Sequence, residues 1–93
     1  MIKSFRSIDA ENLLNGRKVR KLPSDIQKRA MRKLLLLDAA MTLEFLRVPP
    51  ANRLEMLAGD RAGQHSIRIN DQWRICFVWK DGDAFDVEIV DYH

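Results

Sequence analysis

The feature that most constrains the fold is a change in the spacing of apolar residues after Pro49-Pro50. Beyond these prolines, apolar and polar residues alternate in three short runs, which is the period of a strand with one buried face. One side of the runs carries His65, Ile67 and Ile69, then Trp73, Ile75, Phe77 and Trp79, and finally Phe85, Val87 and Ile89. Short polar segments separate the runs, so the sequence predicts three half-buried strands in an antiparallel meander.

The segments before the prolines have helical spacing instead. Ser7 can cap a short helix that runs to Leu14. A longer helix is expected to begin at Pro23, and Ser24 and Gln27 have the spacing of a capping box. Its buried stripe is expected at Ile26, Ala30, Leu34 and Leu37.

Several shorter elements complete the predicted fold. Met1 to Phe5 has the pattern of a weak first strand, and Met41 to Leu46 that of a short helix. Leu54 and Leu57 belong to a poorly defined strand. The expected class is α+β, with a small antiparallel or mixed sheet and the N-terminal helices packed on one face. Residues 1–93 are expected to form a single domain.

The loops between the strands determine which side chains face each other. A two-residue loop at Asp81-Gly82 would place Phe77 opposite Asp86, whereas a three-residue loop at 81–83 keeps core residues opposite core residues. A three-residue loop at 70–72 does the same for the preceding hairpin. The expected pairs are Trp79–Phe85, Phe77–Val87 and Ile75–Ile89 in one hairpin, and Ile67–Ile75 and His65–Phe77 in the other.

The opposite face of the predicted sheet carries a pair of like charges. In this register Arg68 lies across from Arg74, a pairing that destabilises a sheet by roughly 0.2–1 kcal/mol. Tyr92 lies on the same side, diagonal to Arg74. Two guanidinium groups beside a phenol suit the binding of a phosphate. The alternative is that the arginines splay apart, or pair with Asp86 or Glu88 on this face.

The last predicted strand leads into Asp91-Tyr92-His93. An acid, a phenol and an imidazole can move protons near neutral pH, which favours a catalytic function. A tyrosine packed at the sheet edge beside a loose histidine is the simpler alternative. Strict alternation places His93 on the core side with Asp91, so it reaches Arg74 only if these residues leave regular strand geometry.

The charge of the chain is distributed unevenly. Residues 1–33 contain ten Lys and Arg against three Asp and Glu, whereas residues 34–93 contain six against ten. A basic half indicates a polyanion or an acidic protein as partner. The single cysteine, Cys76, fits a reducing cytoplasm, and neither a membrane-spanning run nor a signal peptide is evident.

Two stretches of sequence, residues 59–77 and 87–93, resemble the HigB branch of the RelE/ParE toxin superfamily. The start of the chain is similar as well. This resemblance implies a bacterial type II toxin that enters the A site of the small ribosomal subunit and cuts mRNA there. It also implies a helix-turn-helix antitoxin as partner. The alternatives are a module that binds nucleic acid without cutting it, and a ParE-like inhibitor of DNA gyrase.

The resemblance also implies roles for individual residues. Arg74 would stabilise the phosphorane, His93 would act as general acid or base, and Asp91 would orient the imidazole. Tyr92 would stack on a base or assist proton transfer. The chain has Glu55 and Ala58 where some relatives have histidine and lysine, so the residues expected to complete the RNA site are Arg61, His65 and Arg68. No metal or other cofactor is expected, because the histidines and carboxylates lack the spacing of a metal site.

Overall fold

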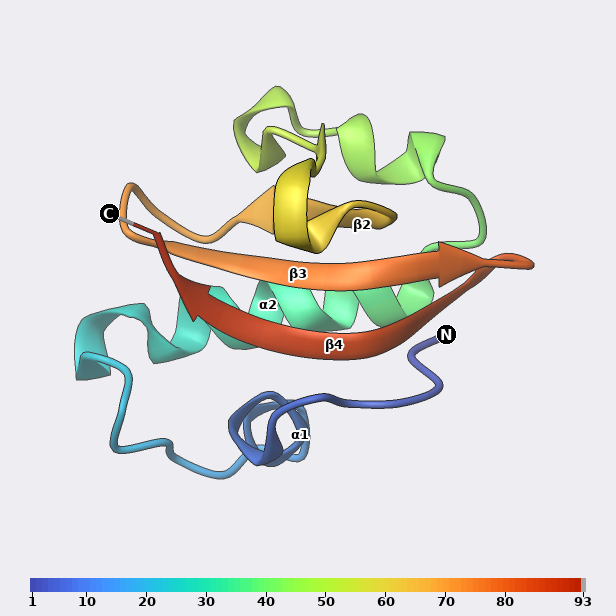
Figure 1. Ribbon diagram of the computed structural model, residues 1–93. Helices are drawn as coiled ribbons and strands as arrows, with labels where there is room; N and C mark the ends of the chain where they lie inside the picture. The colour runs from blue at the N-terminus through green and yellow to red at the C-terminus, as the bar shows by residue number, and fades with distance from the viewer. Residues whose placement is uncertain (93) are drawn as a thin grey trace.

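The computed structural model describes residues 1–92, in which a four-stranded antiparallel sheet is the central element (Figure 1). Its strands follow chain order: β1 (Glu55–Met56), β2 (Gln64–Arg68), β3 (Trp73–Lys80) and β4 (Asp83–Asp91). The three long strands are the predicted meander. The predicted strand around Leu54 and Leu57 is reduced to the two residues of β1.

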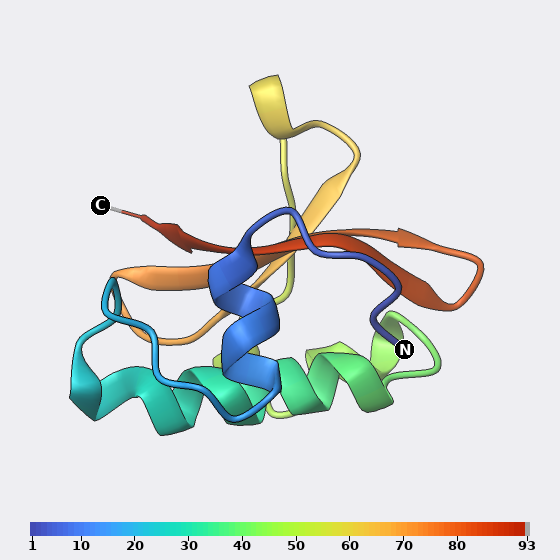
Figure 2. The same ribbon diagram turned by 90° about the horizontal axis from the view of Figure 1, so that it is seen from below.

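Two α-helices pack against this sheet. The longer helix, α2 (Ser24–Ala39), lies across one face of the sheet, and α1 (Ile8–Leu14) packs against both α2 and β4 (Figure 2). The predicted α+β class is therefore confirmed. Short 3-10 helices η1 (Glu44–Arg47), η2 (Pro50–Asn52) and η3 (Gly59–Arg61) fill the connection between α2 and β2.

The buried stripe of α2 is the predicted one, and it forms the core with the facing side of the sheet. Ile26, Ala30, Leu34 and Leu37 are all buried. They share one cluster with side chains from the sheet, which include Ile67, Ile75, Phe77, Val87 and Ile89. Burial of these two apolar surfaces against each other is the main force that fixes the sheet on the helix.

The helix starts differ in how well the sequence predicted them. Ser7 caps α1 as expected, because its Oγ accepts a hydrogen bond from Ala10 N at 3.3 Å. The capping box predicted at Ser24 is wrong, since α2 has no side-chain cap. Gln27 instead forms hydrogen bonds with the backbone N and O of Val19 and with Leu22 O. Its amide therefore fastens the basic loop before α2 onto the helix.

Two further local predictions need correction. Met1 to Phe5 is not a full strand, although Ile2 and Phe5 form isolated parallel bridges with Ala84 and Val87 of β4. The segment thus runs along the edge of the sheet. The short helix expected at 41–46 is the 3-10 helix η1, which starts later, at Glu44.

The sheet register is correct in one hairpin, whereas only one of the three predicted pairs is present in the other. The first hairpin has the predicted pairs Ile67–Ile75, His65–Phe77 and Arg68–Arg74. In the second, Ile75 pairs with Ile89 as expected, but Trp79 pairs with Ala84 and Val78 with Phe85. The loop is the two-residue Asp81-Gly82, and the extra residue lies within β4, at a bulge near Asp86. The bulge, not the loop, restores the buried face.

Candidate active site

The sheet face opposite α2 holds most of the polar side chains predicted for the site. We call it the η3 face, because η3 stands over it (Figure 2). Its cross-strand rows are Ser66–Cys76–Glu88 and Arg68–Arg74–Val90. The end of β4 lies beside the start of β3, since Asp91 pairs with Trp73. This pairing brings the last described residues close to Arg74.

The guanidinium group of Arg74 is held in one orientation by the protein. Only 8% of the residue is exposed. Its Nε donates a hydrogen bond to Ser66 Oγ at 2.8 Å, and its Nη2 donates to Arg53 O at 2.6 Å. Its Nη1 lies 3.8 Å from Glu55 Oε1, whose side chain is 54% exposed. An anionic ligand could therefore bind at the Nη1 edge of Arg74, where it would replace the solvent-exposed Glu55 carboxylate.

Tyr92 lies next to Arg74, as the register predicted. Its backbone N donates a hydrogen bond to Gln72 O at 2.5 Å, which extends the pairing of β3 and β4 by one step. The Arg74 Cζ atom lies 5.8 Å from the centre of the Tyr92 ring, within the range of a cation–π contact. Gln72 Nε2 also donates to Asp91 Oδ2 at 3.2 Å. Gln72 thus fixes both Asp91 and Tyr92.

Arg61 adds a second guanidinium group to the η3 face. Its Nη2 donates a hydrogen bond to Glu88 Oε1 at 2.9 Å, and its Nη1 donates to Gln64 Oε1 at 3.1 Å. The bond to Glu88 raises the pKa of Arg61. Glu88 is also 3.5 Å from Arg6 Nε. The acid that could have paired with Arg74 is thus engaged by Arg61 and Arg6, so Arg74 keeps its own partners.

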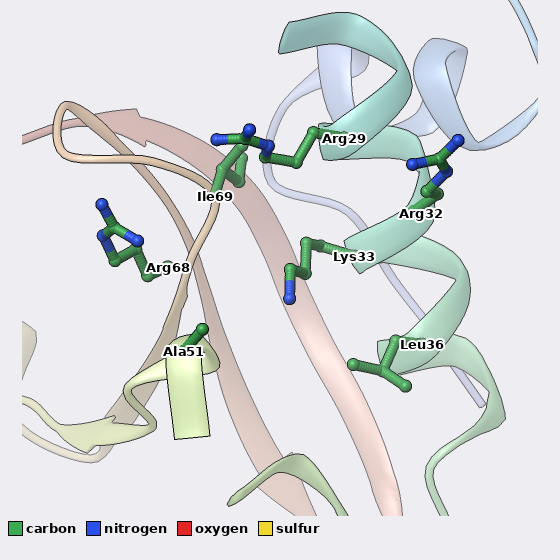
Figure 3. Close-up of a pocket in the computed structure, with 7 residues that line it drawn as sticks. All are labelled: Arg29, Arg32, Lys33, Leu36, Ala51, Arg68 and Ile69. Carbon is green, nitrogen blue, oxygen red and sulfur yellow. The ribbon is translucent and has the colours of Figure 1, made fainter. Parts of the chain in front are cut away.

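Arg68 lies across from Arg74 in the backbone, but the two side chains diverge. The Nη2 atom of Arg68 donates a hydrogen bond to the Asp71 carboxylate. Arg68 also lines a cleft beside α2, although its guanidinium extends away from the α2 side chains (Figure 3). In this structure the two arginines have separate partners, and their joint binding of one anion stays a prediction.

His65 lies on the α2 face of the sheet. Its ring stacks on Phe77 with centroids 6.0 Å apart and an angle of 29° between the planes. Burial lowers its pKa. The structure does not bring His65 to Arg74, since the two side chains leave the sheet on opposite faces. This placement favours packing over a contact with RNA.

Cys76 lies in the row next to Arg74 and is fully buried. Burial raises the pKa of its thiol, although Arg61, Arg74 and the Tyr92 hydroxyl act in the opposite direction. A buried thiol with a raised pKa is a poor nucleophile. We assign Cys76 to packing.

Part of the predicted site lies outside the described residues, namely His93. Within residues 1–92, no group of His, Cys, Asp and Glu side chains has the arrangement of a metal site. In the same range, no helix is long and apolar enough to cross a bilayer.

A family model described as the RelE-like toxin of the type II toxin–antitoxin system HigB matches residues 3–93. The chain belongs to this HigB-like toxin family. The resemblance noted in the sequence is thereby confirmed over nearly the whole length.

Individual relatives of this HigB-like toxin agree with the family match. The protein named Toxin HigB-1 from Vibrio cholerae serotype O1 is 48% identical over 67 residues, which are 72% of this chain and 70% of that protein. The protein named Endoribonuclease HigB from Proteus vulgaris is 32% identical over 93 residues, which cover both chains completely.

Solved structures of similar fold include two from other bacterial proteins. YafQ from Escherichia coli has a TM-score of 0.57 at 13% identity, over 98% of this chain and 93% of that chain. The Staphylococcus aureus YoeB–YefM complex contains a chain with a TM-score of 0.56 at 18% identity, over 100% of this chain and 98% of that chain. At such low identity these likenesses establish the fold of the HigB-like toxin.

The sequence missed several residues that shape the site of this HigB-like toxin. Ser66 and the backbone of Arg53 hold Arg74, and Glu55 faces its remaining edge. Ser66 could have been found, because the predicted register places it next to Arg74. The Arg53 carbonyl carried no such signal, since it comes from an irregular segment after η2.

Proposed function

We propose that this HigB-like toxin is an endoribonuclease that cuts mRNA in the ribosomal A site without a catalytic metal. The observation that carries the proposal is the contact between Arg74 of β3 and Tyr92, which follows the end of β4. His93 is the next residue in the sequence. The relative named Endoribonuclease HigB, similar over its full length, supports the same activity.

The proposed reaction uses the 2′-hydroxyl of the RNA as nucleophile. A base takes its proton while the 2′-oxygen attacks phosphorus, and the bond from phosphorus to the 5′-oxygen breaks. An acid protonates the departing 5′-oxygen, which leaves a 2′,3′-cyclic phosphate and a 5′-hydroxyl. The protein must therefore supply one proton acceptor, one proton donor and positive charge for the phosphorane.

Each of these tasks has a proposed residue on this chain. The Nη1 edge of Arg74 stabilises the phosphorane, for which a phosphate oxygen replaces Glu55 as its neighbour. His93 transfers the proton, Asp91 orients it, and Tyr92 stacks on a base or assists the transfer. Arg61 binds the RNA beside them, because it lies on the same face and is partly exposed. Arg68 binds the RNA at the edge of the site.

We further propose that a helix-turn-helix antitoxin inhibits this toxin, and that both act in the cytoplasm. The family is defined by type II toxin–antitoxin systems, in which the toxin has a protein partner. The YoeB structure was solved as a complex with YefM, which is consistent with a protein partner for this fold.

The test of the proposed function is cleavage of a translated message by the purified toxin, with and without ribosomes. We expect new 5′-hydroxyl ends only when ribosomes are present. Sulfur substitution at the scissile phosphate tests for a catalytic metal, and Mn²⁺ should not restore the lost rate. Cleavage of free mRNA would contradict the ribosome dependence. No cleavage under either condition would favour a module that binds without cutting.

A further inference from the structure

A second basic site lies between α2 and the end of β2, away from the η3 face. It is a cleft of about 570 Å³, which we call the α2 cleft. Its lining residues are Arg29, Arg32, Lys33 and Leu36 from α2, Ala51 from η2, and Arg68 and Ile69 from the end of β2 (Figure 3). Four of these seven residues are cationic, and none of the described lining residues is acidic.

The positive charges gather here through the geometry of α2. Arg32 and Lys33 follow Arg29 by three and four positions, which places all three along one side of the helix. Like charges at this spacing destabilise a helix by roughly 0.2–0.5 kcal/mol per pair. In the described part of the chain, no carboxylate forms an ion pair with these three residues. The repulsion is therefore not offset by a direct ion pair to any of the three.

Lys33 is held in the cleft by a neutral group. Its Nζ donates a hydrogen bond to Asn52 Oδ1, and Asn52 is fully buried. The Asn52 amide is itself fixed, because Nδ2 donates to Leu46 O at 3.1 Å and to Val48 O at 3.2 Å. Burial lowers the pKa of Lys33, and the nearby Arg29 and Arg68 lower it further. Asn52 thus orients the ammonium group without neutralising it.

The cleft and the candidate active site meet at Arg68. It is the direct cross-strand partner of Arg74, and it is also one of the residues that line the α2 cleft. An RNA strand that extends from Arg74 across the end of β2 would therefore contact Arg68 first and α2 next. This continuity distinguishes a polynucleotide from an acidic peptide, which would have no reason to begin at Arg74.

We propose that the α2 cleft binds backbone phosphates of the RNA strand whose scissile phosphate lies at Arg74. The inference rests on the proposed function for the direction of the strand, but the binding itself is separable from cleavage. Guanidinium groups suit this ligand, since they bind phosphate oxygens in a bidentate manner. The cleft would hold the strand in register while the η3 face carries out the reaction.

The test compares two double variants that each lose two positive charges. Arg29→Gln/Arg32→Gln changes the cleft, where both residues are exposed. Arg47→Gln/Lys80→Gln is the matched control, because both residues are exposed and lie outside the cleft. Each protein is titrated with a labelled 2′-O-methyl oligoadenylate, which cannot be cleaved, at several salt concentrations. Thermal unfolding verifies that both variants are folded.

The expected result is a change in the salt dependence of binding. Each lost phosphate contact should reduce the slope of log K against log salt by about 0.7, so the cleft variant should lose about twice that. The control should keep the wild-type slope. Equal slopes for all three proteins, or no binding by the wild-type protein, would overturn the proposal.

Two additional arms separate the alternatives. An oligoglutamate peptide is titrated in parallel, and equal dependence of its binding on Arg29 and Arg32 would overturn the proposal in favour of an acidic protein partner. Message cleavage is measured separately. If the wild-type protein cleaves the message but the cleft variant keeps the wild-type salt slope for RNA binding, only the proposed role of the cleft is overturned. If the cleft variant has a reduced slope but the wild-type protein does not cleave, the role of the cleft is supported and the proposed function is contradicted.

Discussion

At the scale of single residues, the surroundings of Arg74 decide what the site can do. Its guanidinium is buried and bound to Ser66 Oγ and Arg53 O, so its position is set before any ligand arrives. Preorganised charge of this kind stabilises a transition state without the cost of reorientation. Only the Nη1 edge, near Glu55, is available for that purpose.

Replacing Ser66 with alanine should impair catalysis through Arg74. The loss of the 2.8 Å hydrogen bond leaves the buried Nε donor unsatisfied and should cost about 1–3 kcal/mol of stability. We expect a lower single-turnover cleavage rate with little change in the message concentration needed for half-maximal rate. Ser4→Ala is the control, because the Ser4 hydroxyl bonds to Asp86 N at 2.9 Å, far from Arg74 in the sheet. If both variants cleave equally fast, Ser66 has no positioning role.

His65 should make stability depend on pH. Burial lowers its pKa in the folded state, so the unfolded chain takes up a proton at a higher pH than the folded protein does. The free energy of unfolding should therefore fall as the pH drops below about 6.5, the usual pKa of histidine. Urea unfolding at several pH values should show this slope in the wild type and in His93→Gln, and a weaker slope in His65→Gln. An unchanged slope in His65→Gln would contradict the assignment.

At the scale of elements, the bulge in β4 explains why the sequence predicted the buried face but not the register between β3 and β4. Alternation shows that the segment joining Phe77 to its cross-strand partner needs one extra residue to keep apolar side chains opposite each other. It does not show whether that residue lies in the loop or in the strand. Asp81 and Gly82 both have positive φ, as a two-residue hairpin loop requires. The tight loop therefore leaves the extra residue to Asp86, whose φ is 52°.

The bulge can be tested at Asp86. A β-branched residue is strained at this positive φ, so Asp86→Val should lower stability by roughly 1–2 kcal/mol. Asp86→Gly should cost less or stabilise, because glycine adopts this conformation freely. Chemical denaturation of the two variants gives the comparison. A valine variant as stable as the glycine variant would mean that Asp86 does not have this conformation.

The stripe of α2 makes a second prediction for an element. Leu34 is fully buried against the sheet, and Leu34→Ala should cost about 2–5 kcal/mol. Its neighbour Leu35 is 49% exposed, and Leu35→Ala should change stability by no more than about 0.5 kcal/mol. Urea unfolding distinguishes the two. Similar losses for both variants would contradict the orientation of α2.

At the scale of the whole molecule, the two faces of the sheet have separate tasks. One face packs on α2 and supplies stability, and the other gathers Arg61, Arg74 and Tyr92 near the end of β4. The sequence predicted this division, because alternation and one hairpin loop suffice to place Arg74 beside Tyr92. It could not predict the α2 cleft, because Lys33, Asn52 and Arg68 meet only through the packing of α2 against an irregular segment.

The most direct test of the proposed active site uses the only two histidines of the chain, His65 and His93. The measurement is the single-turnover cleavage rate of a ribosome-bound message by His93→Gln and by His65→Gln, with folding of each verified by thermal unfolding. We predict that His93→Gln is slower by about 10²–10⁴-fold, as expected for loss of a general acid or base, while His65→Gln cleaves at nearly the wild-type rate. A folded His93→Gln toxin that cleaves as fast as the wild type would contradict this prediction.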